Sequence, residues 1–408
     1  MRTPFIIAAF LVVGNAFAQV NSAESAATAA LNRHPLTAAA RKEIEAAKAG
    51  KNSLGALRNP DIELIPALTE FGSDTELLIR QPLELNGQRS ARRQVGSIQA
   101  EAARLQAIDT LRSLVRNAKV AWYDYVRASA RLAAALEFER LSKAQLDALA
   151  RQVEEGARPG IEKMQLELEL AGIQREALKA ESQRSQALSR LISATGESDV
   201  NDANLPPVKA QQFVLEDLVV NALSFRGDMR LAMLDINLPN AEAGLVRAEG
   251  MPDFALQYRQ ESFTREPRVG GFGLAVTIPI LDYGSRRGRI TQLNALADAA
   301  RRRFESVQLG AVERVSNAFL EYESANRIAV QFEGLIAKAD ELMRISATGF
   351  QGGQITISQY LDAQRTRQQT QLDFIDAQVD ALNAQAELEF EAALVPDALL
   401  MQVLEGRQ

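Results

Sequence analysis

The side chains best suited to metal or nucleophilic chemistry are nearly absent from this sequence. It has one histidine, His34, and no cysteine among 408 residues. A zinc site needs several imidazole or thiolate ligands, so a transition-metal site of this kind is excluded. His34 precedes Pro35, and this setting predicts a cap or a turn rather than a metal ligand. Without cysteine the chain can form no disulfide.

The remaining chemical candidates are short clusters of arginine and glycine. The chain is acidic overall, with a formal net charge of −6, so we interpret the arginines at 301–303 and 92–93 as solvated or ion-paired helix faces. Residues 270–273 are Gly-Gly-Phe-Gly but precede an expected strand, whereas a dinucleotide-binding loop precedes a helix. We find no catalytic triad, phosphate loop, metal-ligand motif or cofactor-binding motif. We therefore expect neither an enzyme nor a nucleic-acid-binding protein.

The N-terminus has the order of a secretory signal peptide. A positive charge at Arg2 is followed by an apolar core at 5–13 and by a small-x-small triplet at 16–18. This order predicts cleavage after Ala18 and assigns 1–18 to the signal peptide; a buried N-terminal helix is the alternative. No later segment has about 18 consecutive apolar residues, so we expect no membrane-spanning helix.

The rest of the chain is interpreted as an internal duplication. Gly87 in the first copy matches Gly284 in the second, 197 positions later. Further upstream Pro60 matches Pro252, 192 positions later. The two offsets differ by five residues, which predicts a longer loop in the second copy, at 261–271. Chance similarity between Ala-rich helices is the alternative, and the matching prolines and glycines weigh against it.

The duplication divides the chain into four segments. They are the signal peptide at 1–18, a first structural repeat at 19–205, a second structural repeat at 206–395 and a C-terminal tail at 396–408. Two prolines, Pro206 and Pro207, mark the linker between the repeats.

Each repeat is expected to begin with a helix and to contain a much longer one further on. The opening helices are expected at 22–49 and 215–248, and Pro239 should kink or divide the second. Proline-free runs at 88–155 and 285–351 each predict a helix of about 65 residues, or roughly 100 Å. A helix of this length cannot lie inside a globular core and needs parallel neighbours along its whole length.

Glycine-rich turns reverse the chain after both long helices. These tip turns are at 156–160 and 352–354, and shorter return helices are expected at 161–194 and 355–394. Each repeat therefore ends in a long antiparallel helical hairpin.

A pair of strands is expected between the opening helix and the long helix of each repeat. Residues 253–259 and 272–278 alternate apolar with polar or small side chains. That pattern suits an outer-membrane barrel strand and equally an ordinary half-buried hairpin. The alternation at 61–68 and 75–81 is weaker, and Pro66 fits an edge strand or a bulge.

Each strand pair ends at a proline, and a glycine follows before the long helix. Pro82 and Pro279 stop the strand ladder, while Gly87 and Gly284 permit a sharp redirection into the helix. We assign these four residues to the transition between strands and helices. Four strands cannot close a barrel, and an open sheet edge is costly in lipid, so membrane-embedded strands would have to close with those of other chains.

The repeated order of helix, strand pair, long helix, tip turn and return helix resembles the TolC-like outer-membrane efflux proteins over nearly the whole mature chain. The run at 75–89, TELLIRQPLELNGQR, is most similar to the heavy-metal branch, the CzcC-type proteins, in which a Q-P-L-E-L-x-G-x-R run follows the second strand. The resemblance implies a mainly α fold with a membrane β-barrel. Long antiparallel helical hairpins would form a periplasmic α-barrel, and four strands per chain would complete a twelve-stranded barrel in a homotrimer.

The same resemblance implies a location and a set of partners. The protein would be the exit duct of a tripartite efflux system in the outer membrane of a Gram-negative bacterium, extending into the periplasm. It would contact outer-membrane lipid, a periplasmic adaptor protein and an inner-membrane RND-type pump, and would pass heavy-metal cations passively without a cofactor. Some efflux ducts carry lipid on an N-terminal cysteine, which this chain lacks.

The resemblance also assigns a periplasmic gate and a surface for the adaptor. The family run Y-x-x-G followed by D-x-x-D falls on Phe350 and Gly353, then on Gln359 and Asp362. Asp362 keeps an acid, Gln359 lacks one, and Glu162 takes the acidic place in the first tip. Rings of carboxylates from three chains would favour cations; a solvated helix face is the alternative. The residues assigned to adaptor contact are Gly156, Ala157, Arg158, Gly352, Gly353 and Gln354.

Three alternatives stay open. Drug or multidrug efflux and type I secretion are rival roles for a duct, since the inner-membrane pump usually selects the cargo. A non-pore periplasmic coiled-coil scaffold is an alternative of another class, and it would be a soluble secreted protein.

Overall fold

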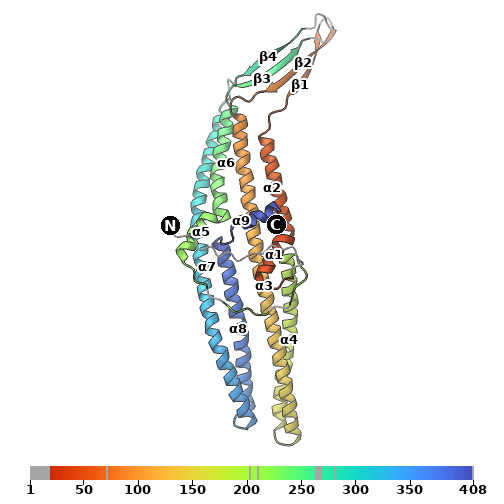
Figure 1. The fold of residues 1–408 in the computed structure, drawn as a ribbon, viewed down its shortest axis with the longest axis vertical. Helices are drawn as coiled ribbons and strands as arrows, with labels where there is room; N and C mark the ends of the chain where they lie inside the picture. The colour runs from red at the N-terminus through yellow and green to blue at the C-terminus, as the bar shows by residue number, and fades with distance from the viewer. Residues whose placement is uncertain are drawn as a thin grey trace. The chain divides into compact units, whose positions relative to one another are not determined.

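The chain folds into long helices and a small antiparallel sheet (Figure 1). The computed structural model describes residues 19–69, 72–201, 204–208, 211–261, 269–279 and 282–406. The predicted signal peptide, 1–18, lies outside the described residues. Among the described residues, no helix is both long and apolar enough to cross a lipid bilayer.

The order of elements repeats. The first copy contains α1 (Ala23–Arg33), α2 (Pro35–Leu54), β1 (Asp61–Thr69), β2 (Gly72–Pro82), α3 (Gln88–Glu154) and α4 (Gly160–Thr195). The second copy contains α5 (Leu215–Phe225), α6 (Gly227–Glu249), β3 (Asp253–Gln260), β4 (Gly270–Thr277), α7 (Ser285–Gln351) and α8 (Ile357–Glu391), and α9 (Asp397–Glu405) follows.

The starts of these elements reproduce both offsets found in the sequence. The starts of α1, α2 and β1 precede those of α5, α6 and β3 by 192 positions, and the starts of α3 and α4 precede those of α7 and α8 by 197. The long helices α3 and α7 each have 67 residues. The segment between β3 and β4, 261–269, is longer than that between β1 and β2, 70–71, although residues 262–268 of the predicted loop lie outside the described ones.

The opening segment of each copy is two helices, so the prediction of single helices at 22–49 and 215–248 was wrong. The breaks fall at His34 and Arg226, whose backbones are extended. His34 precedes a proline, which disfavours the helical conformation at the residue before it. In contrast, α6 runs through Pro239 undivided, since a proline inside a helix removes only one backbone donor.

His34 has the structural role that its setting predicted. It is the C-cap of α1, where its backbone N–H donates to the carbonyl of Ala30 at 3.1 Å. Its Nδ1 accepts a hydrogen bond from the backbone N–H of Leu36 at 3.2 Å. The side chain therefore stabilises the break between α1 and α2.

The chain divides into two compact units, each with its own packing. The first comprises Met1–Ala39, Ile108–Arg226 and Ala311–Gln408, and the second comprises Ala40–Ala107 and Gly227–Gly310. The first unit has two matching cores. In one, Tyr125 of α3 packs with Leu191 of α4 and the alanines of α1; in the other, Tyr322 of α7 packs with Leu388 of α8 and Leu218 of α5. Small alanines allow these helices to approach closely.

The four strands of the second unit form one antiparallel sheet in the order β1-β2-β3-β4. The two copies join at the β2–β3 ladder. Pro66 lies on the edge strand β1, opposite Thr75, which confirms its predicted edge position. The pairing register brings apolar side chains to a single face: Ile62, Leu64, Leu77, Ile79, Leu256, Tyr258, Phe272, Leu274 and Val276.

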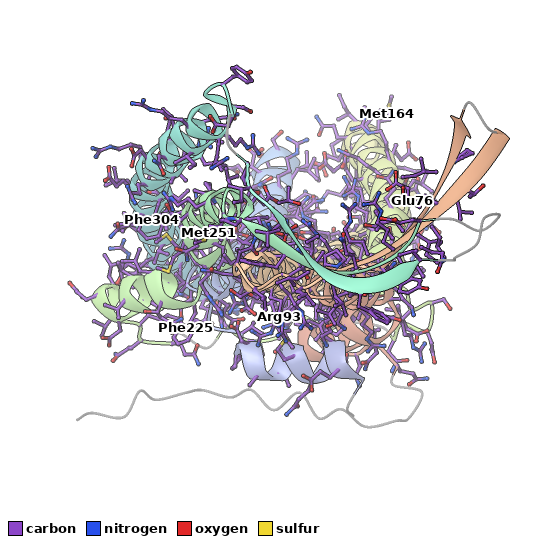
Figure 2. All side chains as sticks on the ribbon, turned by 90° about the horizontal axis from the view of Figure 1, so that it is seen from above. Glu76, Arg93, Met164, Phe225, Met251 and Phe304 are labelled. Atoms are coloured by element: carbon purple, nitrogen blue, oxygen red, sulfur yellow. The ribbon has the colours of Figure 1, made fainter. Side chains whose placement is uncertain are left out.

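The opposite face of the sheet carries the charged side chains. Its members include Arg259 of β3, which forms an ion pair with Glu76 of β2 (labelled in Figure 2), and Arg80, which lies 3.8 Å from Asp61. The sheet therefore has one apolar and one charged face, and most of the apolar face is exposed.

A buried carboxylate fixes the turn between β2 and α3. Glu84 has a positive φ of 47°, and its side chain is only 1% exposed. Its Oε1 accepts a hydrogen bond from Nη1 of Arg92 and lies 3.5 Å from Nε of Arg58. Arg92 also donates to the carbonyls of Leu54 (3.0 Å) and Ala56 (3.1 Å), at the end of α2. Arg92 thus ties α2, the turn and α3 together.

The residues assigned to the transition lie at this turn and at its counterpart in the second copy. Pro82 is the last residue of β2, and Pro279 follows the end of β4 by two residues. Gly87 and Gly284 have φ values of 81° and 86°, in the left-handed region that favours glycine. Both copies therefore turn from strand to helix through a glycine.

We predict that removing the charge of Glu84 destabilises this turn and alters its pH dependence. A Glu84→Gln variant should lower the free energy of unfolding at neutral pH by about 1–3 kcal/mol, because Arg58 and Arg92 lose their buried partner. The hydrogen bond from Arg92 holds the pKa of Glu84 below its ordinary value of 4.5. The wild-type advantage should therefore be complete at neutral pH and shrink as the pH falls below 4.5.

Thermal unfolding of the purified protein between neutral and acidic pH measures this difference. The control is Glu45→Gln, which removes an exposed carboxylate paired with Lys42 at 2.7 Å and should have almost no effect. Equal unfolding midpoints for the two variants at every pH would contradict the role of Glu84.

Candidate functional site

The first helical hairpin closes through a backbone motif centred on Gly156. The N–H of Gly156 donates to the carbonyl of Val153 at 3.0 Å, and the N–H of Ala157 donates to that of Gln152 at 2.8 Å. These nested bonds satisfy the last carbonyls of α3 and require a left-handed residue, which Gly156 provides with a φ of 74°.

The second hairpin closes in the same way, 197 positions later. The N–H of Gly353 donates to the carbonyl of Phe350 at 3.1 Å, and the N–H of Gln354 donates to that of Gly349 at 2.8 Å. Gly353 has a φ of 70°. Gly352, also assigned to adaptor contact, is exposed just before it. The two tips therefore share one backbone design.

The side chains at the two tips differ, and Arg158 of the first tip contacts the second tip. Its Nη2 donates to the backbone carbonyl of Phe350, and its Cζ lies 4.6 Å above the centre of the Phe350 ring. Its Nη1 lies 3.5 Å from Oε2 of Glu162. Arg158 and Glu162 are both partly buried. We call this contact of Arg158 with Phe350 the tip latch.

An apolar cluster packs against Phe350 of the tip latch. The ring of Phe350 stacks on that of Tyr360, with centroids 5.1 Å apart and an interplanar angle of 24°. Tyr360 is buried with Leu149, Leu166 and Leu361, so helices of both hairpins share this cluster. Burial raises the pKa of Tyr360 to about 12, and its phenol therefore stays neutral at physiological pH.

The other two gate candidates lie on the first turns of α8. Gln359 and Thr356 form a capping box, in which Oγ1 of Thr356 accepts from the N–H of Gln359 (3.3 Å) and Oε1 of Gln359 accepts from that of Thr356 (3.0 Å). A neutral glutamine serves this role as well as an acid does. Asp362 is exposed, with its Oδ1 3.7 Å from Nη1 of Arg365. Asp362 is therefore the solvent-exposed carboxylate near the second tip.

Sequence reasoning missed the polar contacts that join the two hairpins near the tips. Arg365 of α8 forms two hydrogen bonds to Glu169 of α4, at 2.6 and 3.2 Å. Gln364 donates to the buried hydroxyl of Ser142 at 2.7 Å. The available signal was a polar residue, Gln364, at a position where the helix pattern favours an apolar one. A contact between repeats leaves no local pattern in the sequence.

A row of ion pairs continues this junction along α3 and α8. The cations all lie on α3 and the carboxylates on α8: Arg116–Glu387, Lys119–Glu389, Arg127–Asp380 and Arg131–Asp376. Arg127 and Arg131, like Asp376 and Asp380, are four residues apart, and this helical spacing was a signal that could have revealed the junction.

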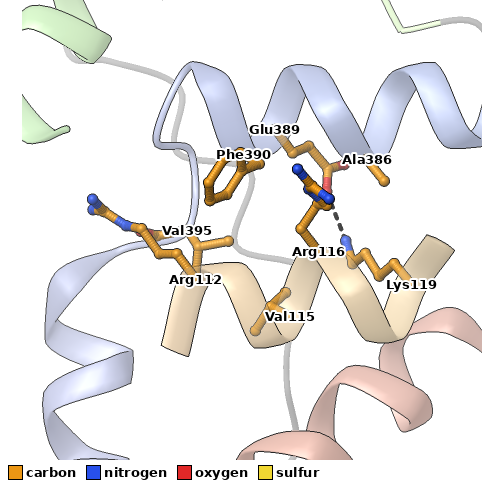
Figure 3. Close-up of a pocket in the computed structure, with 8 residues that line it drawn as sticks. All are labelled: Arg112, Val115, Arg116, Lys119, Ala386, Glu389, Phe390 and Val395. Atoms are coloured by element: carbon orange, nitrogen blue, oxygen red, sulfur yellow. Dashed lines mark hydrogen bonds and ion pairs between the residues drawn. The ribbon is translucent and has the colours of Figure 1, made fainter. Parts of the chain in front are cut away.

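Figure 3 shows a small pocket within this row. Arg116 lies 3.1 Å from Glu387 and 5.1 Å from the centre of the Phe390 ring, while Lys119 pairs with Glu389 at 2.6 Å. The cavity holds only about 10 Å³, which is room for one water at most. Among the described residues, no group of three or more His, Asp or Glu side chains is placed to hold a metal ion. The pocket is therefore part of the helix packing.

Comparison with known proteins identifies the second copy. Residues 218–392, from α5 through α8, match the family described as outer membrane efflux protein. Nodulation protein T of Rhizobium leguminosarum bv. trifolii is 27% identical over 36% of this chain and 33% of its own length. Outer membrane protein OprJ of Pseudomonas aeruginosa is 24% identical over 48% of this chain and 43% of its own length. Both matches span less than half of the relative.

A third relative matches along most of the chain. The cobalt-zinc-cadmium resistance protein CzcC of Cupriavidus metallidurans is 20% identical over 83% of this chain and 81% of its own length. Among solved structures, CusC is similar with a TM-score of 0.78 at 18% identity, covering 96% of this chain and 98% of that one. The CmeC outer membrane channel of Campylobacter jejuni has the same TM-score at 12% identity, covering 94% and 89%. Residues 218–392 are therefore similar to the outer membrane efflux protein family, and the chain has the fold of the CusC and CmeC channels.

Proposed function

We propose that the chain is the outer-membrane exit duct of a tripartite efflux system. In this proposal three copies form a homotrimer, a periplasmic adaptor meets the hairpin tips, and an inner-membrane RND-type pump supplies the cargo. The predicted signal peptide supports export from the cytoplasm, and the absence of cysteine means that the fold itself must hold the protein in the membrane.

The observation that carries the proposal is the amphipathic four-stranded sheet. Its apolar face includes Leu64, Phe272 and Leu274, which are all more than half exposed. Water disfavours such a surface, whereas a bilayer covers it. The edge strands β1 and β4 each have one side without a strand partner among the described residues. Lipid cannot satisfy these backbone groups, so strands from other copies must pair with them.

The tips are the proposed gate. The tip latch joins Arg158 of one hairpin to Phe350 of the other, and separation of the hairpins would have to break it. Asp362, exposed on α8, would contribute one carboxylate from each copy to a ring that favours cations. Because Gln359 is neutral and bonded in the capping box of α8, and Glu162 pairs with Arg158, a second strong acidic ring is not part of the proposal. The exposed tip residues 352–354 and 156–157 would face the adaptor.

Heavy-metal cations are the proposed cargo. The run at 75–89 resembles the heavy-metal branch, and the cobalt-zinc-cadmium resistance protein matches over most of the chain. Drug efflux and type I secretion are the alternatives within the same duct.

We predict that the protein resides in the outer membrane as an integral protein. An alkaline carbonate wash should leave it in the outer-membrane fraction, because lipid covers the apolar face of the sheet. Immunoblotting of the washed membranes and of the soluble periplasm measures the distribution. Recovery of the chain in the soluble fraction would overturn the duct and favour the coiled-coil scaffold.

We predict that breaking the tip latch opens the channel. An Arg158→Ala variant loses a contact worth about 1–2 kcal/mol, so the open fraction should rise roughly 5- to 30-fold. Conductance of the purified protein in planar bilayers measures this change. Arg158→Lys keeps the charge but loses the planar contact, and should have an intermediate effect.

Two further variants test whether the effect of Arg158→Ala comes from loss of the tip latch or from the change in charge near the tip. Arg175→Ala removes an exposed arginine from α4, the helix that follows Arg158 in the chain, and should leave conductance unchanged. Asp362→Asn should reduce the preference for cations in the same recordings without opening the channel. Identical conductance for Arg158→Ala and Arg175→Ala would refute the latch.

We predict that loss of the protein sensitises its host to metals. A deletion strain, with and without plasmid rescue, should grow poorly on gradients of Zn²⁺, Co²⁺, Cd²⁺, Cu²⁺ or Ag⁺, and normally on a panel of drugs and detergents. Rescued sensitivity confined to drugs or detergents would leave the duct standing and would refute the metal cargo.

A further inference from the structure

The turn into α7 lacks the buried carboxylate that anchors the matching turn into α3. In the first copy Glu84 accepts a hydrogen bond from Arg92, which also donates to two backbone carbonyls at the end of α2. The residue equivalent to Glu84, 197 positions later, is Leu281, which has no charge. The residue equivalent to Arg92 is Arg289. The arginine is thus kept in the second copy, whereas its anionic partner is lost.

Two arginines of this turn are consequently open to solvent. Arg289 is 51% exposed; its Nη1 donates to Oε1 of Gln292 at 3.0 Å, and its Nη2 lies 3.9 Å from Oε2 of Glu242. Arg287 takes the place of Ser90 and is exposed. Its side chain has no hydrogen-bond or ion-pair partner among the described residues.

Arg286 has a different role, which both copies share. Its Nη1 donates to the carbonyl of Gly250 at 3.3 Å. In the first copy its equivalent, Arg89, donates from Nε to the carbonyl of Gly55 at 2.8 Å. Arg286 therefore holds the turn itself, and Arg287 and Arg289 are left without a structural task.

These cations lie next to the apolar face of the sheet. Between Asp282 and Asp298 the sequence has three arginines and no acid, although the whole chain has a net charge of −6. Figure 1 shows β4 leading into α7, and Ile278, just past the end of β4, is 60% exposed. Tyr283 is 93% exposed. An apolar surface, then an exposed tyrosine, then cations is the order expected across a membrane–water interface.

We propose that Tyr283, Arg287 and Arg289 bind the headgroups of anionic phospholipids at the periplasmic edge of the barrel. We call these three residues the phospholipid site. The inference rests on the proposed duct, which places the apolar face of the sheet in the bilayer, and it adds a class of lipid and the residues that recognise it. Phosphate oxygens accept hydrogen bonds from the two guanidinium groups, and the tyrosine ring lies at the level of the headgroups.

The placement of the two arginines suits a layer of headgroups better than a free anion. Arg287 and Arg289 are two residues apart in α7, so they project to nearly opposite sides of the helix. Along the helix axis they are only about 3 Å apart. An anion in solution would contact one of them at a time. Headgroups arranged around a helix that leaves the bilayer contact both at the same depth.

Native mass spectrometry of the full-length protein in detergent tests the site through the lipids that it retains. The protein is mixed with equal amounts of phosphatidylglycerol, which is anionic, and phosphatidylcholine, which has no net charge, with the same acyl chains. Wild-type protein should retain more phosphatidylglycerol. Combining Arg287→Gln with Arg289→Gln should lower this preference roughly fivefold for each arginine removed. Equal retention of the two lipids by the wild type would overturn the proposal.

A matched pair of substitutions controls for the loss of two positive charges. Arg301→Gln with Arg302→Gln also removes two exposed arginines from α7. These residues lie about 20 Å further along the helix, beyond the roughly 8 Å over which salt screens exposed charges at physiological ionic strength. This double variant should keep the wild-type preference. The same loss in both double variants would refute the phospholipid site.

The contribution of the tyrosine ring is tested separately. Tyr283→Asn introduces the residue of the first copy, Asn86, and asparagine tolerates the positive φ of 48° at this position. The ring has no charge, so its loss should lower the retention of both lipids to a similar degree. Unchanged retention, or a loss confined to phosphatidylglycerol, would remove Tyr283 from the site.

Inorganic phosphate distinguishes a lipid headgroup from a free anion as the ligand. Compared with sodium chloride of the same ionic strength, inorganic phosphate should leave the retained phosphatidylglycerol unchanged. Displacement of this lipid by phosphate from the wild type would overturn the lipid as the specific ligand.

The carbonate wash separates failure of the phospholipid site from failure of the duct. Wild-type protein that stays in washed outer membranes but shows no preference for phosphatidylglycerol would refute the site and leave the duct standing. Wild-type protein in the soluble fraction would refute both.

Discussion

The length of α3 and α7 is the constraint on which the rest of the structure depends. Each has 67 residues, far more than a small core can cover, and most of the stability of a helix comes from packing against its neighbours. Each long helix therefore needs partners along its whole length. The return helices α4 and α8 supply one side, the alanines of α1 permit close approach, and the ion-pair row between α3 and α8 supplies another side.

At the ends of the two long helices the backbone turns are the same in both repeats, but the side chains differ. Gly156 and Gly353 close the two tips through the same hydrogen bonds, so the duplication preserved the turns. Arg158 has Ile355 as its equivalent, and Phe350 has Val153. The latch therefore joins two positions that are not equivalent, and neither of its residues is retained in the other repeat.

Much of the architecture was predictable because it depends on the spacing of residues along the chain. The offsets of 192 and 197, the proline-free runs and the alternation at 253–259 each gave the correct element. The break at His34 was also predictable, since a proline follows it, although a single helix was expected. The proposed gate was harder to predict. Gln359 was interpreted as a position that had lost an acid, whereas it completes the capping box of α8 with Thr356. The contact of Arg158 with Phe350 depends on how two distant hairpins pack.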